Sequence, residues 1–137
     1  MLGKVKIPNL VWLTIVLLVS GLGFWYRSEI FTPYQAEKIS TAYSQSQYVL
    51  GDKSSAKIDD ATLYQYAASA YLNGEDPATI NFEHPPLAKY VYGVFLRSTG
   101  WILLANLVFL FGCLVLTAKL LTHFKVKLVF QIVSLIY

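Results

Sequence analysis

The chain has 137 residues, of which 55% are hydrophobic and only 14% are charged. Soluble domains contain about a quarter charged residues, so this composition argues against an ordinary soluble domain and favours a membrane protein. The formal net charge of +3 averages segments of opposite sign, and it gives no support to nucleic-acid binding. The single cysteine, Cys113, lies in an apolar run, which excludes a disulfide framework outside the membrane.

Two long runs without a charged side chain, residues 7–26 and 98–118, divide the sequence. They are 20 and 21 residues long, and a helix needs about 20 apolar residues to cross a hydrocarbon core of roughly 30 Å. Each run therefore predicts a complete transmembrane helix. The first run is longer than the apolar part of a signal peptide and ends in an aromatic cluster, so we expect it to remain uncleaved. Residues 128–137 predict the start of a third transmembrane helix, which indicates the N-terminal part of a larger protein.

Lysine positions predict the orientation of these helices. All eight acidic residues and six basic residues fall in the loop 27–97, which therefore has a net charge of −2. Cytoplasmic segments are enriched in Lys and Arg, so the N-terminus and the 119–127 turn are predicted to be cytoplasmic and the loop extracytoplasmic. The lysines that carry this prediction lie outside the loop: Lys4, Lys6, Lys119, Lys125 and Lys127.

The loop is expected to contain amphipathic helices at the membrane surface. Residues 36–48 favour a helix and residues 51–55 a turn. A second helix is predicted over 59–73, because Asp59 or Asp60 is a suitable N-cap and Asn73-Gly74 is a typical stop. Its apolar positions follow helical spacing: Leu63, Tyr66, Ala67, Ala70 and Tyr71.

A further interfacial helix is predicted to begin at Pro86, since proline is well tolerated in the first turn of a helix. It should end near residues 97–100, before the second transmembrane run. Its apolar positions are Leu87, Tyr90, Val91, Val94 and Phe95. The two loop helices then bracket a charged turn, Glu83-His84-Pro85-Pro86, which the two prolines stiffen.

Each polar residue of this loop also has a simple structural interpretation. Asp59 or Asp60 would then serve only as an N-cap, and Glu83 and His84 only as solvated loop residues. The proline pair would be a stiff connector. The tyrosines of both helices would form an interfacial belt: Tyr64, Tyr66, Tyr71, Tyr90 and Tyr92.

The order of these elements after one membrane span resembles the first extracytoplasmic loop of GT-C glycosyltransferases. The similarity is greatest to the dolichyl-phosphate-mannose protein O-mannosyltransferase family, whose members carry an Asp-Glu pair, a helix ending in Tyr-x-x-Gly and then His-Pro-Pro-Leu-Gly-Lys. Lipid A aminoarabinose transferases look similar, with Glu-Lys-Pro-Pro-Leu. This chain departs from the first pattern at Asp60, at Ala88 and in the Thr62-Leu63-Tyr64 stretch. These departures bear mainly on the acceptor.

The resemblance implies an enzyme that moves a sugar, by default mannose, from a polyprenyl- or dolichyl-phosphate donor to a hydroxyl acceptor on the outer membrane face. The expected acceptor is a protein Ser or Thr, with a lipid-linked hydroxyl as the other choice. Asp59 matches the family's first acid and is the expected general base, with Asp60 orienting it or binding acceptor. Glu83 and His84 are candidate ligands for a divalent metal ion, although two ligands are too few for a complete site. The residues expected to contact substrate are Glu83, His84, Pro85, Pro86 and Lys89, with Lys89 or His84 stabilising the departing phosphate.

The sequence thus predicts an all-α integral membrane protein with two complete transmembrane helices, a truncated third and a long extracytoplasmic loop. By itself this part of the chain is expected to be inactive, because further helices would have to enclose donor and acceptor. Two alternatives stay open. One is a non-catalytic subunit or scaffold of the same architecture, and the other is an unrelated small membrane protein whose loop binds peptide or lipid.

Overall fold

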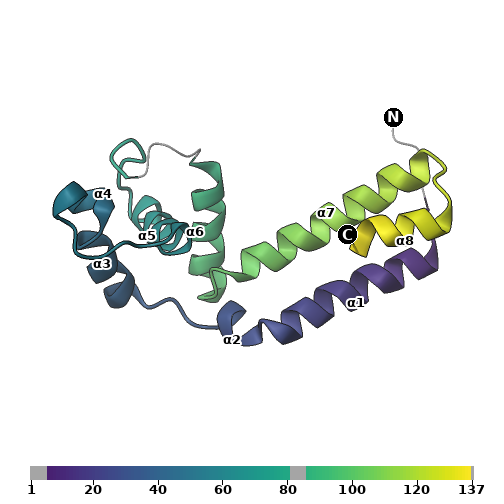
Figure 1. The fold of residues 1–137 in the computed structure, drawn as a ribbon, viewed down its shortest axis with the longest axis horizontal. Helices are drawn as coiled ribbons and strands as arrows, with labels where there is room; N and C mark the ends of the chain where they lie inside the picture. Colours follow the sequence, from purple (N-terminus) through teal and green to yellow (C-terminus); the bar gives the residue numbers. More distant parts are fainter. Residues whose placement is uncertain (1–5, 81–85, 137) are drawn as a thin grey trace. The chain divides into compact units, whose positions relative to one another are not determined.

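The structure is a computed structural model that describes residues 6–80 and 86–136 (Figure 1). The described residues are helical, with one isolated β-bridge between Ser46 and Ala56, which confirms the predicted all-α class. The chain forms two units, which we name the terminal unit (Met1–Ile30 and Asn106–Tyr137) and the loop unit (Phe31–Ala105). The helices in chain order are α1 (Asn9–Trp25), α2 (Arg27–Ile30), α3 (Ala36–Ser44), α4 (Gln47–Leu50), the 3-10 helix η1 (Gly51–Lys53), α5 (Asp60–Leu72), α6 (Leu87–Thr99), α7 (Leu104–His123) and α8 (Leu128–Ile136).

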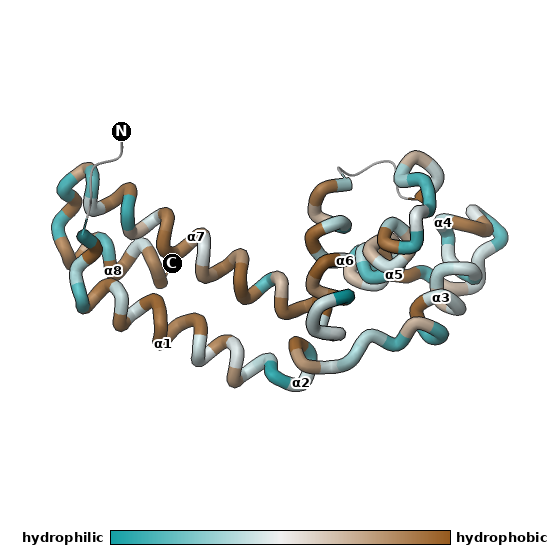
Figure 2. The backbone as a smooth tube through the Cα atoms, turned by 180° about the vertical axis from the view of Figure 1, so that it is seen from behind, coloured by the Kyte–Doolittle hydropathy of each residue, from teal (hydrophilic) through white to brown (hydrophobic). Residues whose placement is uncertain are grey.

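The terminal unit packs α1, α7 and α8 around a small apolar core. The buried members of this core come from all three helices or their ends: Ile7, Val11, Ile15, Ala118 and Leu135. Figure 2 shows that hydrophobic residues predominate along these helices. Large apolar side chains point outward, among them Leu17, Leu116 and Val129 at 63%, 61% and 68% exposure. Such an extensive exposed apolar surface is unusual for a monomer in water and suits contact with lipid.

Two polar side chains of the terminal unit, Gln131 and Thr122, form hydrogen bonds within it. Gln131 is buried, and its amide nitrogen donates to the Val126 carbonyl at 2.7 Å. The Thr122 hydroxyl donates to the Gln131 side-chain oxygen at 3.2 Å and to the Ala118 carbonyl at 2.7 Å. These bonds join the end of α7 to the start of α8 across a turn in which Lys125 adopts a positive φ of 54°. The buried Gln131 amide is therefore satisfied by partners within the same unit, as a buried polar group requires.

One helix of the described residues, α7, is long and apolar enough to cross a membrane. It spans 20 residues, whereas α1 is a shorter apolar helix of 17 residues. The run predicted over 98–118 is therefore shifted. Gly100, with φ 77°, ends α6, and α7 begins only at Leu104 and continues past Lys119 to His123. A long lysine side chain near a helix end extends its ammonium towards water, so a charge-free run does not fix a helix boundary.

The loop unit is built around α5, which packs against α3 and α6 (Figure 1). Four of the five apolar positions predicted for α5 are buried, namely Leu63, Ala67, Ala70 and Tyr71, and Tyr66 is half-buried. The predicted bounds of this helix are confirmed within one residue. Its apolar face is filled by protein, however, so contact with α3 and α6 replaces the lipid contact expected from its amphipathic pattern.

Helix α6 meets α5 through a face that the apolar pattern indicated only in part, since Val91 and Phe95 are half-buried and the Tyr90 ring lies 5.2 Å from that of Tyr71. Its buried residues are Lys89 and Gly93, whereas Leu87, Tyr90 and Val94 are 72%, 41% and 60% exposed. A Cβ atom on Gly93 would lie 2.8 Å from Leu72 Cγ and 3.0 Å from the Ala68 carbonyl oxygen. The absence of a side chain at Gly93 thus permits the close approach of the two helices.

The other helices and the turn predicted for the loop are confirmed with one break. The helix predicted over 36–48 is interrupted after Ser44, because Ser46 leaves helical geometry and accepts a hydrogen bond from the Tyr48 backbone N–H as the N-cap of α4. The turn predicted over 51–55 contains η1. Pro86 occupies the N-cap position of α6, next to its predicted place.

Candidate functional site

Asp59 stands at the N-cap of α5. Its backbone is extended, and its Oδ1 accepts a hydrogen bond of 2.8 Å from the Thr62 N–H. The hydrogen bond from Thr62 lowers the pKa of Asp59, because it stabilises the charged carboxylate. Asp60 follows as the first residue of the helix, and both side chains are exposed. The capping role considered for this acidic pair is therefore confirmed for Asp59, and it leaves the pair accessible to solvent.

The segment that leads into Asp59 is held by Gln47, a residue that the sequence did not single out. The Gln47 amide nitrogen donates to the Ile58 carbonyl at 3.0 Å, and its side-chain oxygen accepts from the Ile58 N–H at 3.0 Å. One side chain thus satisfies both backbone groups of the residue before Asp59. The two partners lie 11 positions apart, and no local pattern signals such a pairing. The consequence is a fixed entry into α5.

Lys89 lies inside the loop unit on the face of α6 that meets α5. Its side chain has no exposed surface, and its Nζ lies 5.1 Å from the centre of the Tyr64 ring. Burial lowers the pKa of Lys89, because removing water disfavours the ammonium form. Tyr64 follows Asp60 by four residues, so this cation lies beside the turn of α5 next to the acidic pair. Contact of Lys89 with a substrate stays a prediction, since solvent does not reach the side chain in this structure.

The chain between α5 and residue 80 is pinned by a buried hydrogen bond. The Tyr71 hydroxyl donates to the Ile80 carbonyl at 2.7 Å, and Asp76 Oδ1 accepts from the Ala78 N–H at 2.9 Å. The next five residues, 81–85, lie outside the described residues, and they include Glu83, His84 and Pro85. Pro86 is described and exposed. Tyr71 therefore anchors the last described position before the predicted Glu83-His84-Pro85-Pro86 motif.

The metal prediction concerns the same segment. Among residues 6–80 and 86–136, no three His, Cys, Asp or Glu side chains lie together as a metal site would need. Glu83 and His84 lie outside those ranges, so a divalent metal held by them stays a prediction.

Geometrically, the described part of the site combines an exposed acidic pair at a helix N-terminus with a buried cation beside the same helix. This combination suits a reaction in which a proton is accepted near the place where an anion departs. No protein-family model, curated protein or solved structure matches the chain.

Proposed function

We propose that this chain belongs to a membrane glycosyltransferase that uses a polyprenyl-phosphate sugar as donor and a hydroxyl group as acceptor, with mannose as the default sugar and protein Ser or Thr as the default acceptor. The proposal is carried by one observation, the exposed Asp59 carboxylate held at the N-terminus of α5 by its Thr62 hydrogen bond and by the Gln47–Ile58 pairing. A base fixed in this way loses little entropy when it meets its substrate.

In the proposed reaction, the acceptor oxygen attacks the anomeric carbon of the donor sugar. The bond from that carbon to the phosphate oxygen breaks, and the electron pair leaves with the polyprenyl phosphate. Asp59 takes the acceptor proton on Oδ2, because Oδ1 already accepts from Thr62. Asp60 orients the acceptor hydroxyl. The Lys89 charge, buried beside the same helix, favours the departing anion through a medium of low dielectric constant. His84, Glu83 and Pro85 with Pro86 are proposed to contact the donor phosphate, directly or through a divalent metal ion.

The proposed membrane placement puts α1 and α7 across the bilayer, α8 at the start of a third crossing, and the loop unit on the extracytoplasmic side. The exposed apolar surface of the terminal unit supports this placement, as does the outward face of α6 formed by Leu87, Tyr90 and Val94. The 17 residues of α1 extend about 26 Å at 1.5 Å per residue, at the short end of the range for a crossing helix.

Cysteine labelling tests this topology. In a Cys113→Ser background, Ser55→Cys reports on the loop unit and Lys127→Cys on the α7–α8 turn, and both positions are exposed. A membrane-impermeant maleimide should label Ser55→Cys in intact cells and Lys127→Cys only after permeabilisation. Labelling of both positions from the same side would contradict the proposed topology.

Release of polyprenyl phosphate tests the transfer activity. Membranes containing the full-length protein should convert polyprenyl-phosphate mannose to polyprenyl phosphate and glycosylated acceptor, and matched membranes without the protein should not. A rate equal to that of the matched membranes, with mannose and other hexose donors alike, would refute the transferase proposal.

One observation favours the second candidate, a non-catalytic subunit of the same architecture. A general base works best when its pKa is near the working pH, whereas the Thr62 hydrogen bond lowers the pKa of Asp59. A purely structural Asp59 would have this same environment. Asp59→Asn, an uncharged cap of the same shape, separates the two roles of this residue. Transfer is lost in this variant if Asp59 is the base, and it is unchanged if Asp59 is only a cap.

A further inference from the structure

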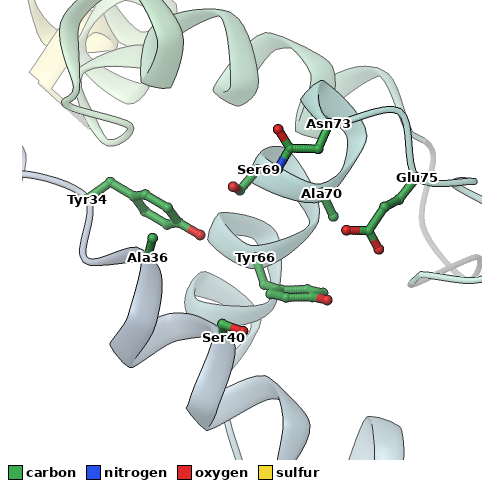
Figure 3. Close-up of a pocket in the computed structure, with 8 residues that line it drawn as sticks. All are labelled: Tyr34, Ala36, Ser40, Tyr66, Ser69, Ala70, Asn73 and Glu75. Carbon is green, nitrogen blue, oxygen red and sulfur yellow. The ribbon is translucent and has the colours of Figure 1, made fainter.

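A second feature of the loop unit lies between α3 and the C-terminal half of α5. It is a pocket of about 230 Å³. Its polar and aromatic walls come from three segments, the chain before α3, α3 itself and α5 with the turn after it, and Figure 3 shows these side chains together: Tyr34, Ser40, Tyr66, Ser69, Asn73 and Glu75. None of them belongs to the acidic pair or to the predicted proline motif.

The Tyr66 ring forms a firm wall of this pocket. It stacks on Tyr43 with ring centres 3.7 Å apart and planes inclined by 12°, so one face of the ring is covered and the ring is held in place. In Figure 3, the Tyr34 and Glu75 side chains reach towards Tyr66 from opposite sides. A ligand ring with an apolar face can pack against such a wall, with polar groups available at its edge.

The two side chains at the rim are positioned by backbone geometry. The Tyr34 N–H donates to the Gly100 carbonyl at 3.2 Å. Glu75 follows Gly74, which lies just after the end of α5 and adopts a left-handed backbone with a φ of 86°. There the Glu75 N–H donates to the Ala70 carbonyl at 3.1 Å, the bond expected when a left-handed glycine closes a helix. The pocket therefore has a preformed rim.

Charge restricts the class of ligand. Among the described residues that line the pocket none is basic, and Glu75 contributes a negative charge, which disfavours phosphates and carboxylates. Burial and the Glu75 charge raise the pKa of Tyr66, so its hydroxyl stays protonated at neutral pH and can donate. The amide of Asn73 and the hydroxyls of Ser40 and Ser69 both donate and accept. Such a wall suits a neutral ligand that carries several hydroxyl groups.

We propose that this pocket binds a single uncharged pyranose ring, with the apolar face of the sugar against Tyr66 and sugar hydroxyls bonded to Glu75 and Asn73. The volume is below the range of about 300–1,000 Å³ that holds drug-sized ligands, which favours one sugar ring over a longer glycan. Ser69 lies ten residues beyond Asp59 on α5, or about 15 Å at 1.5 Å per residue. The pocket is thus a separate sugar site that goes beyond the proposed transfer reaction, and it binds sugar whether or not Asp59 is a base.

The test measures binding of methyl α-D-mannopyranoside and methyl α-D-glucopyranoside to the full chain in phospholipid nanodiscs, by saturation-transfer NMR and titration. Saturable binding of at least one glycoside is expected. Ser40→Leu fills the pocket from an exposed position of α3 and should weaken binding roughly tenfold or more, as should Glu75→Gln. Ser44→Leu, one turn further along α3 and not in the pocket wall, is the matched control and should bind as the original protein does.

Helical circular dichroism of each variant confirms that it is folded. Asp59→Asn should leave glycoside binding unchanged, which separates this site from the proposed transfer reaction. The proposal is overturned if neither glycoside binds saturably, or if Ser40→Leu and Ser44→Leu bind equally well. Binding of tetramethylammonium in place of the glycosides would also overturn it, since the pocket would then be a cation site made of tyrosine rings and a carboxylate.

Discussion

Substitution of Gly93 by alanine should loosen the contact between α5 and α6. The added Cβ would lie 2.8 Å from Leu72 Cγ, 3.2 Å from Leu72 Cδ2 and 3.0 Å from the Ala68 carbonyl oxygen. Two of these partners are a branched side-chain carbon and a backbone atom, which do not move without disturbing the helix. The substitution therefore forces the two helices apart rather than rotating one flexible side chain.

The magnitude follows from two opposing contributions. Overpacking costs about 1–3 kcal/mol, and a contact under 3.0 Å beside a backbone oxygen places this substitution in the upper part of that range, at about 2–3 kcal/mol. Replacing glycine by alanine inside a helix gains about 1 kcal/mol. We expect a net loss of roughly 1–2 kcal/mol in the free energy of opening the α5–α6 pair, which corresponds to about a 5- to 30-fold increase in the open population. In a Leu72→Ala background, the effect of Gly93→Ala should shrink, since two of the three close contacts are then removed.

Native-state hydrogen exchange measures this local opening in the full protein. Amide protons of α5 and α6 should exchange about 5- to 30-fold faster in Gly93→Ala, in proportion to the open population. Gly21→Ala in α1 is the matched control, because a Cβ there meets nothing within 4 Å, and it should leave α5 and α6 unchanged. Slower or unaltered exchange of α5 and α6 in Gly93→Ala, or an equal effect in the Leu72→Ala background, would refute the packing at this position.

Three further changes test the support of the site. Tyr71→Phe removes the buried donor to the Ile80 carbonyl and should cost about 1–3 kcal/mol, measured as faster exchange in α5. Gln47→Leu removes both bonds to Ile58 and should cost about 1–3 kcal/mol, measured as faster exchange of the Ile58 amide. Asp59→Ala should cost about 1 kcal/mol at pH 7. Because the folded pKa of Asp59 is lowered, its stabilisation is present above the ordinary carboxyl pKa of about 3.9 and is lost as pH falls through the folded pKa.

Each of these changes has its own control. Tyr26→Phe removes the hydroxyl of a half-exposed residue outside the loop unit and should have little effect on exchange in that unit. Gln47→Glu keeps an acceptor for the Ile58 N–H but cannot donate to its carbonyl, so it should fall between the original protein and Gln47→Leu. Asp59→Asn caps a helix about as well as aspartate and does not titrate, so its stability should lack this acidic transition. Exchange in α5 that is accelerated equally by Tyr26→Phe and Tyr71→Phe would contradict the assigned Tyr71 bond. An Ile58 amide that exchanges at the original rate in Gln47→Leu would contradict the assigned Gln47 bonds. A stability difference between Asp59→Ala and the original protein that does not shrink on acidification would contradict the Asp59 assignment.

Helix boundaries were predicted well where the residues that set them lie close to the boundary in the sequence. Asp59 caps α5 through a residue three positions away, and Gly74 ends it through its own positive φ, so both boundaries follow from short stretches of sequence. Contacts between distant residues were not predicted. The pairing of Gln47 with Ile58 leaves no periodic pattern, and the same is true of the pocket rim, where Tyr34 is placed by Gly100.

The orientation of α6 shows a second limit. Its apolar pattern marks one face, but hydrophobicity alone does not say whether protein or lipid covers that face, which carries Leu87, Tyr90, Val91, Val94 and Phe95. In the structure Leu87, Tyr90 and Val94 stay exposed, and α6 packs on α5 through the neighbouring face that carries Gly93, because Gly93 allows α6 to approach the backbone of α5 closely. The charge-free run predicted the position of α7 but not its two ends. At the N-terminal end, Gly100 ends α6 and α7 begins only at Leu104. At the C-terminal end, the helix continues past Lys119, because a lysine is tolerated near a helix end.

The most direct test of the proposed reaction is the rate of sugar transfer by Asp59→Asn in membranes containing the full-length protein. Asparagine keeps the cap of α5 and removes the carboxylate, so a folding defect and a missing base are separated in a single variant. If Asp59 is the base, hydrogen exchange of α5 should stay at its original level while transfer from polyprenyl-phosphate sugar falls about 100-fold or more. Transfer at the original rate with an intact α5 would show that Asp59 is a structural cap only.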